Sequence, residues 1–376
     1  MKKLSLVTVL ALMLGLILFV LSSCSEEYEP VASTEEEARV VMTLKIENKT
    51  YDVKYELYRA LFLSNKSEVD GGNDDVWSGN DKNEYISKIN AIIIEKAADI
   101  YSVIHTATEL GVDIYSKEFD DAVSEYIKIN VEGNGSSIKG HGSYESYLAA
   151  LKDMNMNYSV SDLMLRYSLA LDKINEYYFG KVVDEITGET EGGVSVSDDD
   201  ISAFYYGNES TRILSGYWQK GTSVSVSEIR NMLAAESDTD MIAALMVIHS
   251  TATSSELHNN QNPAGEKAVG SVIGKYSLND LYYKEYTDAA FSLSHGEVSH
   301  PIELTGTGDS LNEGYYILCG LEKSDYYFEN NKSMVKTAYL DNLIGKQLYL
   351  AEDALVKSAK ATDNYNSIIH SDITME

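Results

Sequence analysis

Apolar residues recur with a helical period along much of the chain, which predicts several core-facing helices. The clearest stripe lies within residues 84–111 and ends at Gly111; it consists of Ile86, Ile89, Ile93, Ala97, Ile100 and Ile104. Ser116 is placed to cap a second helix, with Phe119, Val123 and Tyr126 on its apolar face. After a Gly-rich break at residues 133–142 two more helices are expected, the second with the stripe Leu163, Tyr167, Ala170, Ile174 and Tyr178. A final long helix over residues 333–359 carries Leu340, Ile344, Leu348, Ala351 and Leu355.

Alternating and turn-forming stretches predict the remaining elements. Apolar and polar residues alternate over residues 42–53, on both sides of Asn48 and Lys49, and this pattern indicates a short hairpin. Residues 64–83 are rich in Gly, Asp and Asn, which indicates a loop. Further helices are expected at 198–206, after Ser227 and at 278–291, with a polar loop at 250–270. Strands are expected at 211–219, 298–304 and 314–321. This mixture of separate helices and a small sheet predicts an α+β fold.

A Gly-, Glu- and Ser-rich break at residues 187–197 marks the expected domain boundary. Too few residues follow the final helix to form a domain, so we expect this helix to return and pack on the amino-terminal helices. The predicted divisions are a signal peptide at 1–23, a flexible tether at 24–40, a helical domain at 41–190, a second domain at 198–325 and the returning helix within 326–376.

The first residues have the parts of a secretory signal peptide. Lys2 and Lys3 precede an uncharged apolar run over residues 4–21, and small residues lead to Cys24. A retained membrane helix is the alternative, because the run is near the lower limit for spanning about 30 Å of hydrocarbon. The ending Leu-Ser-Ser-Cys resembles a bacterial lipobox, which implies lipidation of Cys24 and attachment to the outer face of the cytoplasmic membrane.

Composition narrows the possible partners. The chain has 376 residues and a formal net charge of −29, and removal of Lys2 and Lys3 leaves 28 basic against 59 acidic residues, or −31. Nucleic-acid binding is not expected, because contacts with phosphate require clustered Lys and Arg. Such acidity favours solubility outside the cell, and it would also favour basic segments of a polypeptide partner.

Candidate chemistry is sparse. Cys319 lies in an apolar run and is predicted to be a buried core residue, with a reactive thiol as the alternative. The seven histidines make no recognised metal-ligand spacing, and His249, His258, His295 and His300 are expected at the surface. No catalytic serine motif or phosphate-binding loop is present, so neither a metal nor a cofactor is expected.

Two stretches carry a pattern that resembles parvulin-type (PpiC) prolyl isomerases. Residues 289–302 read Ala-Ala-Phe-Ser-Leu-Ser-His-Gly-Glu-Val-Ser-His-Pro-Ile, and residues 314–318 read Gly-Tyr-Tyr-Ile-Leu. With the linker helix at 196–201, the helical segment at 144–179 and the lipobox, most of residues 41–360 resembles the extracytoplasmic foldases of the SurA and PrsA type. The resemblance implies a helical chaperone domain formed with the C-terminal helix, and an inserted parvulin-like domain with a small antiparallel sheet flanked by helices.

The resemblance also implies where a site would lie. Parvulins have a histidine on the first strand and another after the Gly-Tyr pair, but Ser215 and Tyr316 stand at these positions. Apolar substrate contacts would fall on Tyr282, Tyr286 and Phe291, for which core packing is the alternative. Rotation of a prolyl bond has a barrier of about 18–20 kcal/mol and involves no covalent step, so a pocket without both histidines could retain weak activity.

These features predict a membrane-anchored foldase or chaperone that acts on unfolded or newly exported polypeptides, with a weak or inactive parvulin-like domain. Two alternatives stay open. One is a fully active peptidyl-prolyl cis–trans isomerase on the same fold, and the other is a surface lipoprotein that binds one dedicated partner.

Overall fold

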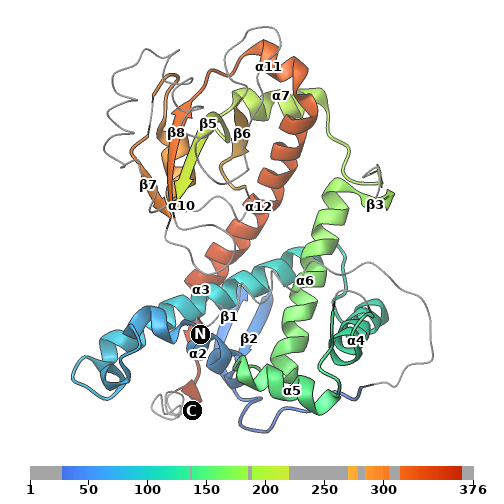
Figure 1. Ribbon diagram of the computed structural model, residues 1–376, viewed down its shortest axis with the longest axis vertical. Helices are drawn as coiled ribbons and strands as arrows, with labels where there is room; N and C mark the ends of the chain where they lie inside the picture. Colours follow the sequence, from blue (N-terminus) through green and yellow to red (C-terminus); the bar gives the residue numbers. More distant parts are fainter. Residues whose placement is uncertain are drawn as a thin grey trace. The chain divides into compact units, whose positions relative to one another are not determined.

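The computed structural model describes residues 28–135, 138–184, 189–219, 270–277, 284–297, 299–304 and 314–365. The chain divides into two compact units. The first unit is Met1–Tyr177 with Gln347–Glu376, and the second is Tyr178–Lys346. Both combine helices with a small antiparallel sheet, which confirms the predicted α+β class (Figure 1).

The first unit begins with the predicted hairpin. Strand β1 (Val40–Ile46) pairs antiparallel with β2 (Lys49–Lys54), and Leu44 lies opposite Tyr51. Six helical elements follow: α2 (Tyr55–Asp70), the 3₁₀ helix η2 (Asp74–Trp77), α3 (Lys82–Glu109), α4 (Lys117–Glu132), α5 (Tyr144–Asp153) and α6 (Tyr158–Phe179). The stripe predicted for α3 is confirmed, since Ile89, Ile93 and Ala97 are fully buried.

The carboxyl-terminal part of the chain adds a strand to this hairpin. Helix α12 (Lys332–Ser358) leads into the short strand β9 (Lys360–Ala361), which pairs antiparallel with β1. The sheet order is therefore β2-β1-β9, with β2 at one edge. A side-chain contact supports the pairing, because the backbone N–H of Lys45 donates to Ser358 Oγ at 2.6 Å.

The second unit is built on a four-stranded antiparallel sheet of order β6-β5-β8-β7 (Figure 1). Its strands are β5 (Ser210–Gln219), β6 (Ser271–Gly274), β7 (Ile302–Leu304) and β8 (Gly314–Gly320). The other elements of this unit are the hairpin of β3 (Lys181–Asp184) and β4 (Glu189–Glu191), and the helices α7 (Asp198–Tyr206), α10 (Lys284–Ser292) and α11 (Asp325–Asn330).

Two apolar clusters hold the second unit together. Helix α10 packs on one face of the sheet, where Tyr286 and Ala290 meet Ile213, Ile273 and Leu318. The other cluster joins α7, α11 and the first part of α12; it contains Ile201, Phe204, Tyr205, Tyr327, Phe328, Val335 and Ala338. Ser197 caps α7 through a reciprocal hydrogen-bond pair with Asp200, which fixes the predicted start of that helix.

One predicted loop is wrong in part. Residues 64–70 continue helix α2, and Trp77 within the expected loop is 1% exposed. The polar end of α2 is stabilised by a residue just beyond it, because Trp77 Nε1 donates to the Asp70 carboxylate at 2.7 Å. Gly71 then ends the helix with φ of +61°, a conformation that glycine adopts without strain.

Several other predictions can be compared with the described residues. The expected break at 187–197 contains part of the β3–β4 hairpin, and the strand expected at 298–304 begins at Ile302. Cys319 is fully buried, as predicted. The signal peptide, Cys24, the helix after Ser227 and most of the polar loop at 250–270 lie outside the described residues.

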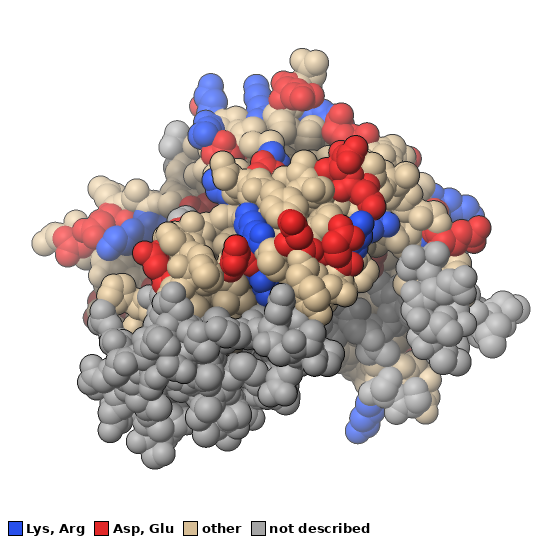
Figure 2. Space-filling model, turned by 90° about the horizontal axis from the view of Figure 1, so that it is seen from above, with Lys and Arg blue, Asp and Glu red and all other residues tan. Residues whose placement is uncertain are grey.

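Charged side chains of both signs are distributed over the surface. On the face drawn in Figure 2, Lys and Arg lie interspersed with Asp and Glu. Among the described residues, no helix combines the length and apolar character that crossing a bilayer requires.

Candidate functional site

The two parvulin-pattern positions lie on one face of the second unit's sheet. Ser215 on β5 is opposite Leu318 on β8, and Tyr316 is two residues from Leu318. Directly opposed residues share a face, as do alternate residues of a strand, so Ser215 and Tyr316 are neighbours on that face. Ser215 is 6% exposed, and its hydroxyl has no hydrogen-bond partner among the described residues.

Helix α10 covers this same face. The rings of Tyr286 and Tyr316 are perpendicular, with centroids 5.3 Å apart, and Tyr286 is 1% exposed. Phe291 is half-buried and packs against the same cluster. The structure therefore brings together Ser215, Tyr286, Phe291 and Tyr316, whereas Tyr282 lies outside the described residues.

A cavity of about 420 Å³ lies at the end of α10, beside the turn of the parvulin-like pattern. Its described lining comes from residues 289–302 and includes Leu293, Pro301 and Ile302, with the exposed His300 at its margin. His295 is also exposed, so both of these histidines lie at the surface as predicted, while His249 and His258 lie outside the described residues. Within the described part of the chain, no cluster of His, Cys, Asp and Glu could hold a metal ion.

The first unit contains a larger groove that the sequence did not indicate. Its volume is about 800 Å³, and its walls come from β2, the start of α2, α3, the α3–α4 connection and α6. The apolar part of the lining is Leu57, Ile104, Val112, Ile114, Val160 and Leu163. Charged groups of both signs surround this apolar floor, among them Lys54, Arg166 and Asp52.

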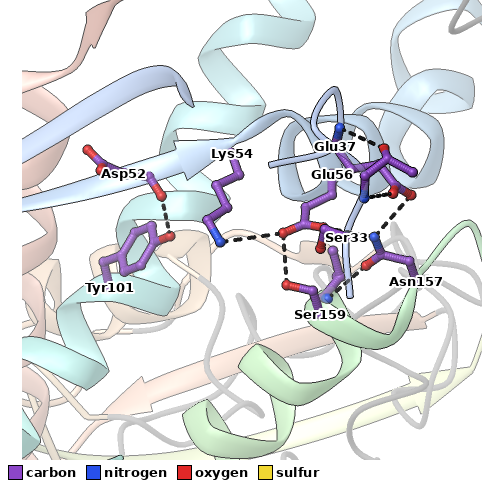
Figure 3. Close-up of polar contacts among 10 residues, drawn as sticks. Ser33, Glu37, Asp52, Lys54, Glu56, Tyr101, Asn157 and Ser159 are labelled. Atoms are coloured by element: carbon purple, nitrogen blue, oxygen red, sulfur yellow. Dashed lines mark hydrogen bonds and ion pairs between the residues drawn. The ribbon is translucent and has the colours of Figure 1, made fainter. Parts of the chain in front are cut away.

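A buried carboxylate fixes one end of the groove (Figure 3). Glu56 is 6% exposed and accepts hydrogen bonds from Ser33 Oγ at 2.5 Å, Asn157 Nδ2 at 2.8 Å and Ser159 Oγ at 2.8 Å. Lys54 Nζ lies 3.8 Å from the same carboxylate. Asn157 also accepts from the backbone N–H of Val160, so one side chain both caps α6 and ties it to α2.

An aromatic pair forms a second wall of the groove. Tyr51 of β2 stacks on Tyr101 of α3 with ring centroids 5.1 Å apart, and its hydroxyl lies 3.1 Å from His105 Nδ1. Burial, and then the nearby Lys49, lowers the pKa of His105, which favours its neutral imidazole. The Tyr101 hydroxyl donates to the backbone carbonyl of Asp52 at 2.8 Å (Figure 3).

Arg166 of α6 holds the opposite side of the groove. The guanidinium is 8% exposed and donates to Asp162 at 2.9 Å, to Asp120 at 2.8 Å and to the carbonyl of Ile114 at 2.6 Å. It also lies 5.3 Å from the ring centroid of Tyr115, a side chain that is 70% exposed. The groove therefore combines an apolar floor with a polar rim, as ligand-binding sites in proteins commonly do.

Finding this groove from the sequence would have required contacts between distant segments. The hairpin and the α3 and α6 stripes were predicted, but the helix α2 that carries Glu56 and Leu57 was not. The capping position of Asn157 was a local signal, since Asn is a preferred residue at a helix start. Its hydrogen bond to Glu56 joins residues 101 positions apart and has no local signature.

No protein-family model and no curated protein matches the chain. Among solved structures it is similar to the foldase protein PrsA from Streptococcus pneumoniae, with 16% identity, a TM-score of 0.25, and coverage of 74% of this chain and 90% of that one. PrsA from Bacillus subtilis shares 16% identity over 85% and 93% of the two chains, with a TM-score of 0.23. The foldase protein PrsA from Lactococcus lactis shares 14% identity over 89% and 99%, with a TM-score of 0.23.

Proposed function

We propose that this protein is a membrane-tethered extracytoplasmic chaperone that binds unfolded or newly exported polypeptides. The observation that carries the proposal is the groove of the first unit, with its apolar floor, exposed Tyr115 and charged rim. Apolar side chains of an unfolded segment would be removed from water when they pack on this floor. The backbone of the segment would form hydrogen bonds with polar groups of the rim. No cofactor or covalent step is involved.

The parvulin-like part of the chain is proposed to be weak or inactive as an isomerase. Ser215 and Tyr316 replace the histidines that the parvulin pattern implies, and Tyr286 fills the space over their face of the sheet. A catalyst of prolyl rotation must bind a twisted imide better than the planar one. Ser215 is 6% exposed, so its hydroxyl has little access to such a substrate.

The test compares binding with catalysis in purified residues 25–376. We expect suppression of aggregation of a chemically unfolded client at stoichiometric amounts, with little acceleration of a proline-limited refolding reaction. Tyr286→Ala and Phe291→Ala serve as paired variants. Strong catalysis that both variants retained would contradict the assignment of these residues, and a failure to suppress aggregation would contradict the chaperone proposal.

Membrane attachment is proposed to depend on acylation of Cys24, which the lipobox-like sequence indicates. Two or three acyl chains give a lasting anchor, whereas a single chain binds only marginally. Cys24→Ala, or inhibition of the lipoprotein signal peptidase by globomycin, is expected to change the processing of the chain and its retention in the membrane fraction. Unchanged processing and retention would exclude the lipid anchor.

Full prolyl isomerase activity is the second candidate, and the cavity of about 420 Å³ favours it. That cavity adjoins the parvulin-like turn and is lined by Leu293, Pro301 and Ile302, with His300 at its margin. Exchange spectroscopy on a short proline peptide separates the two functions, because a chaperone leaves the cis–trans exchange rate unchanged. A rate that rises in proportion to protein concentration would favour the isomerase.

A further inference from the structure

Strand β2 is an edge strand, and its outer edge borders the groove of the first unit. Among the described residues, the sheet order β2-β1-β9 leaves one side of β2 without a neighbouring strand. Thr50, Asp52 and Lys54 from this strand line the groove. Edge strands offer a row of unpaired N–H and C=O groups to any extended chain that reaches them, and most proteins cover or block such edges.

The register shows which backbone groups of β2 point into the groove. Lys45 N–H donates to Ser358, and Val41 C=O accepts from Thr362, so these odd-numbered residues of β1 point toward β9. Thr50 lies opposite Lys45, and Asp52 lies opposite Thr43. In an antiparallel pair such residues direct their own N–H and C=O groups away from the partner strand.

Two further hydrogen bonds agree with this alternation of inward- and outward-pointing backbone groups. The Tyr101 hydroxyl of α3 donates to the Asp52 carbonyl (Figure 3). The N–H of Tyr55, an odd-numbered position, donates to the Arg39 carbonyl. Within the described part of the chain, Thr50 N–H, Thr50 C=O and Asp52 N–H have no hydrogen-bond partner. A carbonyl oxygen has two lone pairs, so Asp52 C=O can accept from Tyr101 and from a second donor.

Building on the proposed function, we propose that the groove takes an extended client segment as an added strand on the free edge of β2. Main-chain hydrogen bonds would supply affinity that depends little on sequence, and alternate client side chains would rest on the apolar floor. Strand β2 covers Lys49–Lys54, so an added strand of about five or six residues, rising about 3.3 Å each, matches its length.

Charge complementarity indicates the preferred client. Lys49 pairs with Glu109 at 2.7 Å and Lys54 lies near Glu56, so the positive charges at the two ends of β2 are already matched. The exposed Asp52 carboxylate has no ion-pair partner among the described residues. The client is therefore an unfolded segment that alternates apolar residues with Lys or Arg, and one basic side chain meets Asp52.

The protein side of the test uses one position and two substitutions. Thr50→Pro removes only a groove-facing N–H, which an edge strand tolerates, whereas Thr50→Val keeps that N–H and is the matched control. Binding of a fluorescent peptide of alternating valine and lysine to the full chain is measured by anisotropy. We expect Thr50→Pro to weaken binding by about tenfold, since one main-chain hydrogen bond is lost and the proline ring hinders pairing at the edge, and Thr50→Val to bind as the wild type does.

The peptide side of the test keeps the proposal falsifiable if Thr50→Pro fails to fold. Two versions of the peptide carry N-methyl groups on alternate amides. These two phases have the N-methyl groups on the odd-numbered and on the even-numbered amides, respectively. Strand addition predicts that one phase abolishes binding to the wild-type chain and the other preserves it. Asp52→Asn is expected to weaken binding of the lysine peptide about two- to fivefold and to leave a glutamine counterpart unchanged.

Three results would overturn the inference. Equal binding of the two N-methyl phases, with aggregation of a client still suppressed, would exclude strand addition and leave the proposed function intact. If the wild-type chain neither binds the peptide nor suppresses aggregation, both strand addition and the proposed function are excluded. A dimer in sedimentation experiments that Thr50→Pro dissociates would assign the edge to a second copy of the chain.

Discussion

Two serines of β5 are both buried, yet they differ in hydrogen bonding. Ser210 is 3% exposed; its hydroxyl lies 2.7 Å from the carbonyl of Phe204 and accepts from Lys323 Nζ at 3.2 Å. Ser215 is 6% exposed and has no partner for its hydroxyl among the described residues. A buried hydroxyl without a partner has lost its hydrogen bonds to water and gained nothing in exchange.

This difference predicts opposite effects of the same substitution. Ser215→Ala is expected to leave the free energy of unfolding unchanged or to raise it by up to about 1 kcal/mol, because it removes an unpaired polar group. Ser210→Ala, the matched control on the same strand, is expected to lower it by about 1–3 kcal/mol. Urea unfolding followed by circular dichroism measures both. A clear loss of stability in Ser215→Ala would mean that its hydroxyl has a partner outside the described residues.

Glu56 illustrates how a buried charge is kept in a folded protein. Three hydrogen-bond donors and Lys54 surround its carboxylate, and they come from the amino-terminal segment, β2 and α6. Glu56→Ala would leave Ser33, Asn157 and Ser159 without their acceptor, and we expect a loss of about 2–4 kcal/mol. Glu35→Ala, at an exposed position, is the control and should change stability by less than about 0.5 kcal/mol. Equal stabilities of the two variants in urea would contradict this account.

At the scale of elements, the turn between α4 and α5 depends on close backbone packing. Gly133, Gly135 and Gly140 all have positive φ angles. A Cβ atom on Gly140 would clash with the backbone of Glu132 and Gly133, whereas one on Gly135 would meet no atom of the described residues within 4 Å, its chain neighbours aside. These two glycines therefore separate the cost of the backbone conformation from the cost of a clash.

Gly135→Ala is expected to cost about 1–2 kcal/mol, the ordinary penalty for a left-handed alanine. Gly140→Ala is expected to cost more, about 3 kcal/mol or above, because either the backbone or the end of α4 must also move. Thermal unfolding of the two variants side by side provides the measurement. Similar melting temperatures would show that the turn adapts and that the close approach stabilises little.

The α3 and α12 helices bring carboxylates together. Burial, and then Asp99 and Glu95, raises the pKa of Glu352 to about 7, from an ordinary value of 4.5. The folded state therefore holds a proton that the unfolded state releases between these pH values. Stability from this group is complete below pH 4.5 and is lost as the pH rises to 7.

Glu352→Gln should remove this pH dependence. We expect equal melting temperatures of variant and wild type near pH 4.5, and a higher melting temperature of the variant at pH 8. The gain at pH 8 is of the order of 1 kcal/mol after allowance for solvent screening. Glu35→Gln removes one exposed charge and is the control. A variant that is no more stable than the wild type at pH 8 would contradict the raised pKa.

Elements with a regular apolar period were predictable, and elements held by distant partners were not. The α3 stripe and the Ser197 cap of α7 are local signals, and both appear where expected. Strand β9 has only two residues, and it is defined by its pairing with β1, which lies at the other end of the chain. In the candidate site the sequence placed Ser215 and Tyr316 on strands, but only the register brings them to one face. The groove required α2, α3 and α6 together, which no local pattern indicates.

At the scale of the whole molecule, the acidity of the chain is expected to favour the approach of basic partners. The chain without residues 1–23 has a formal charge of −31. Long-range attraction raises association rates of oppositely charged partners, and salt screens it: the Debye length is about 10 Å at 0.1 M ionic strength and about 3 Å at 1 M. Short-range contacts in an apolar groove are affected far less.

The two contributions can be separated by measuring association and dissociation rates of unfolded clients at different salt concentrations. For a basic client, we expect the association rate to fall about tenfold or more between 0.05 M and 1 M salt, with little change in the dissociation rate. An acidic client of equal length and apolar content should associate slowly at low salt and faster as salt rises. If both clients associate at equal rates at low salt, net charge has no part in client choice, and selection must then occur after contact, in the groove itself.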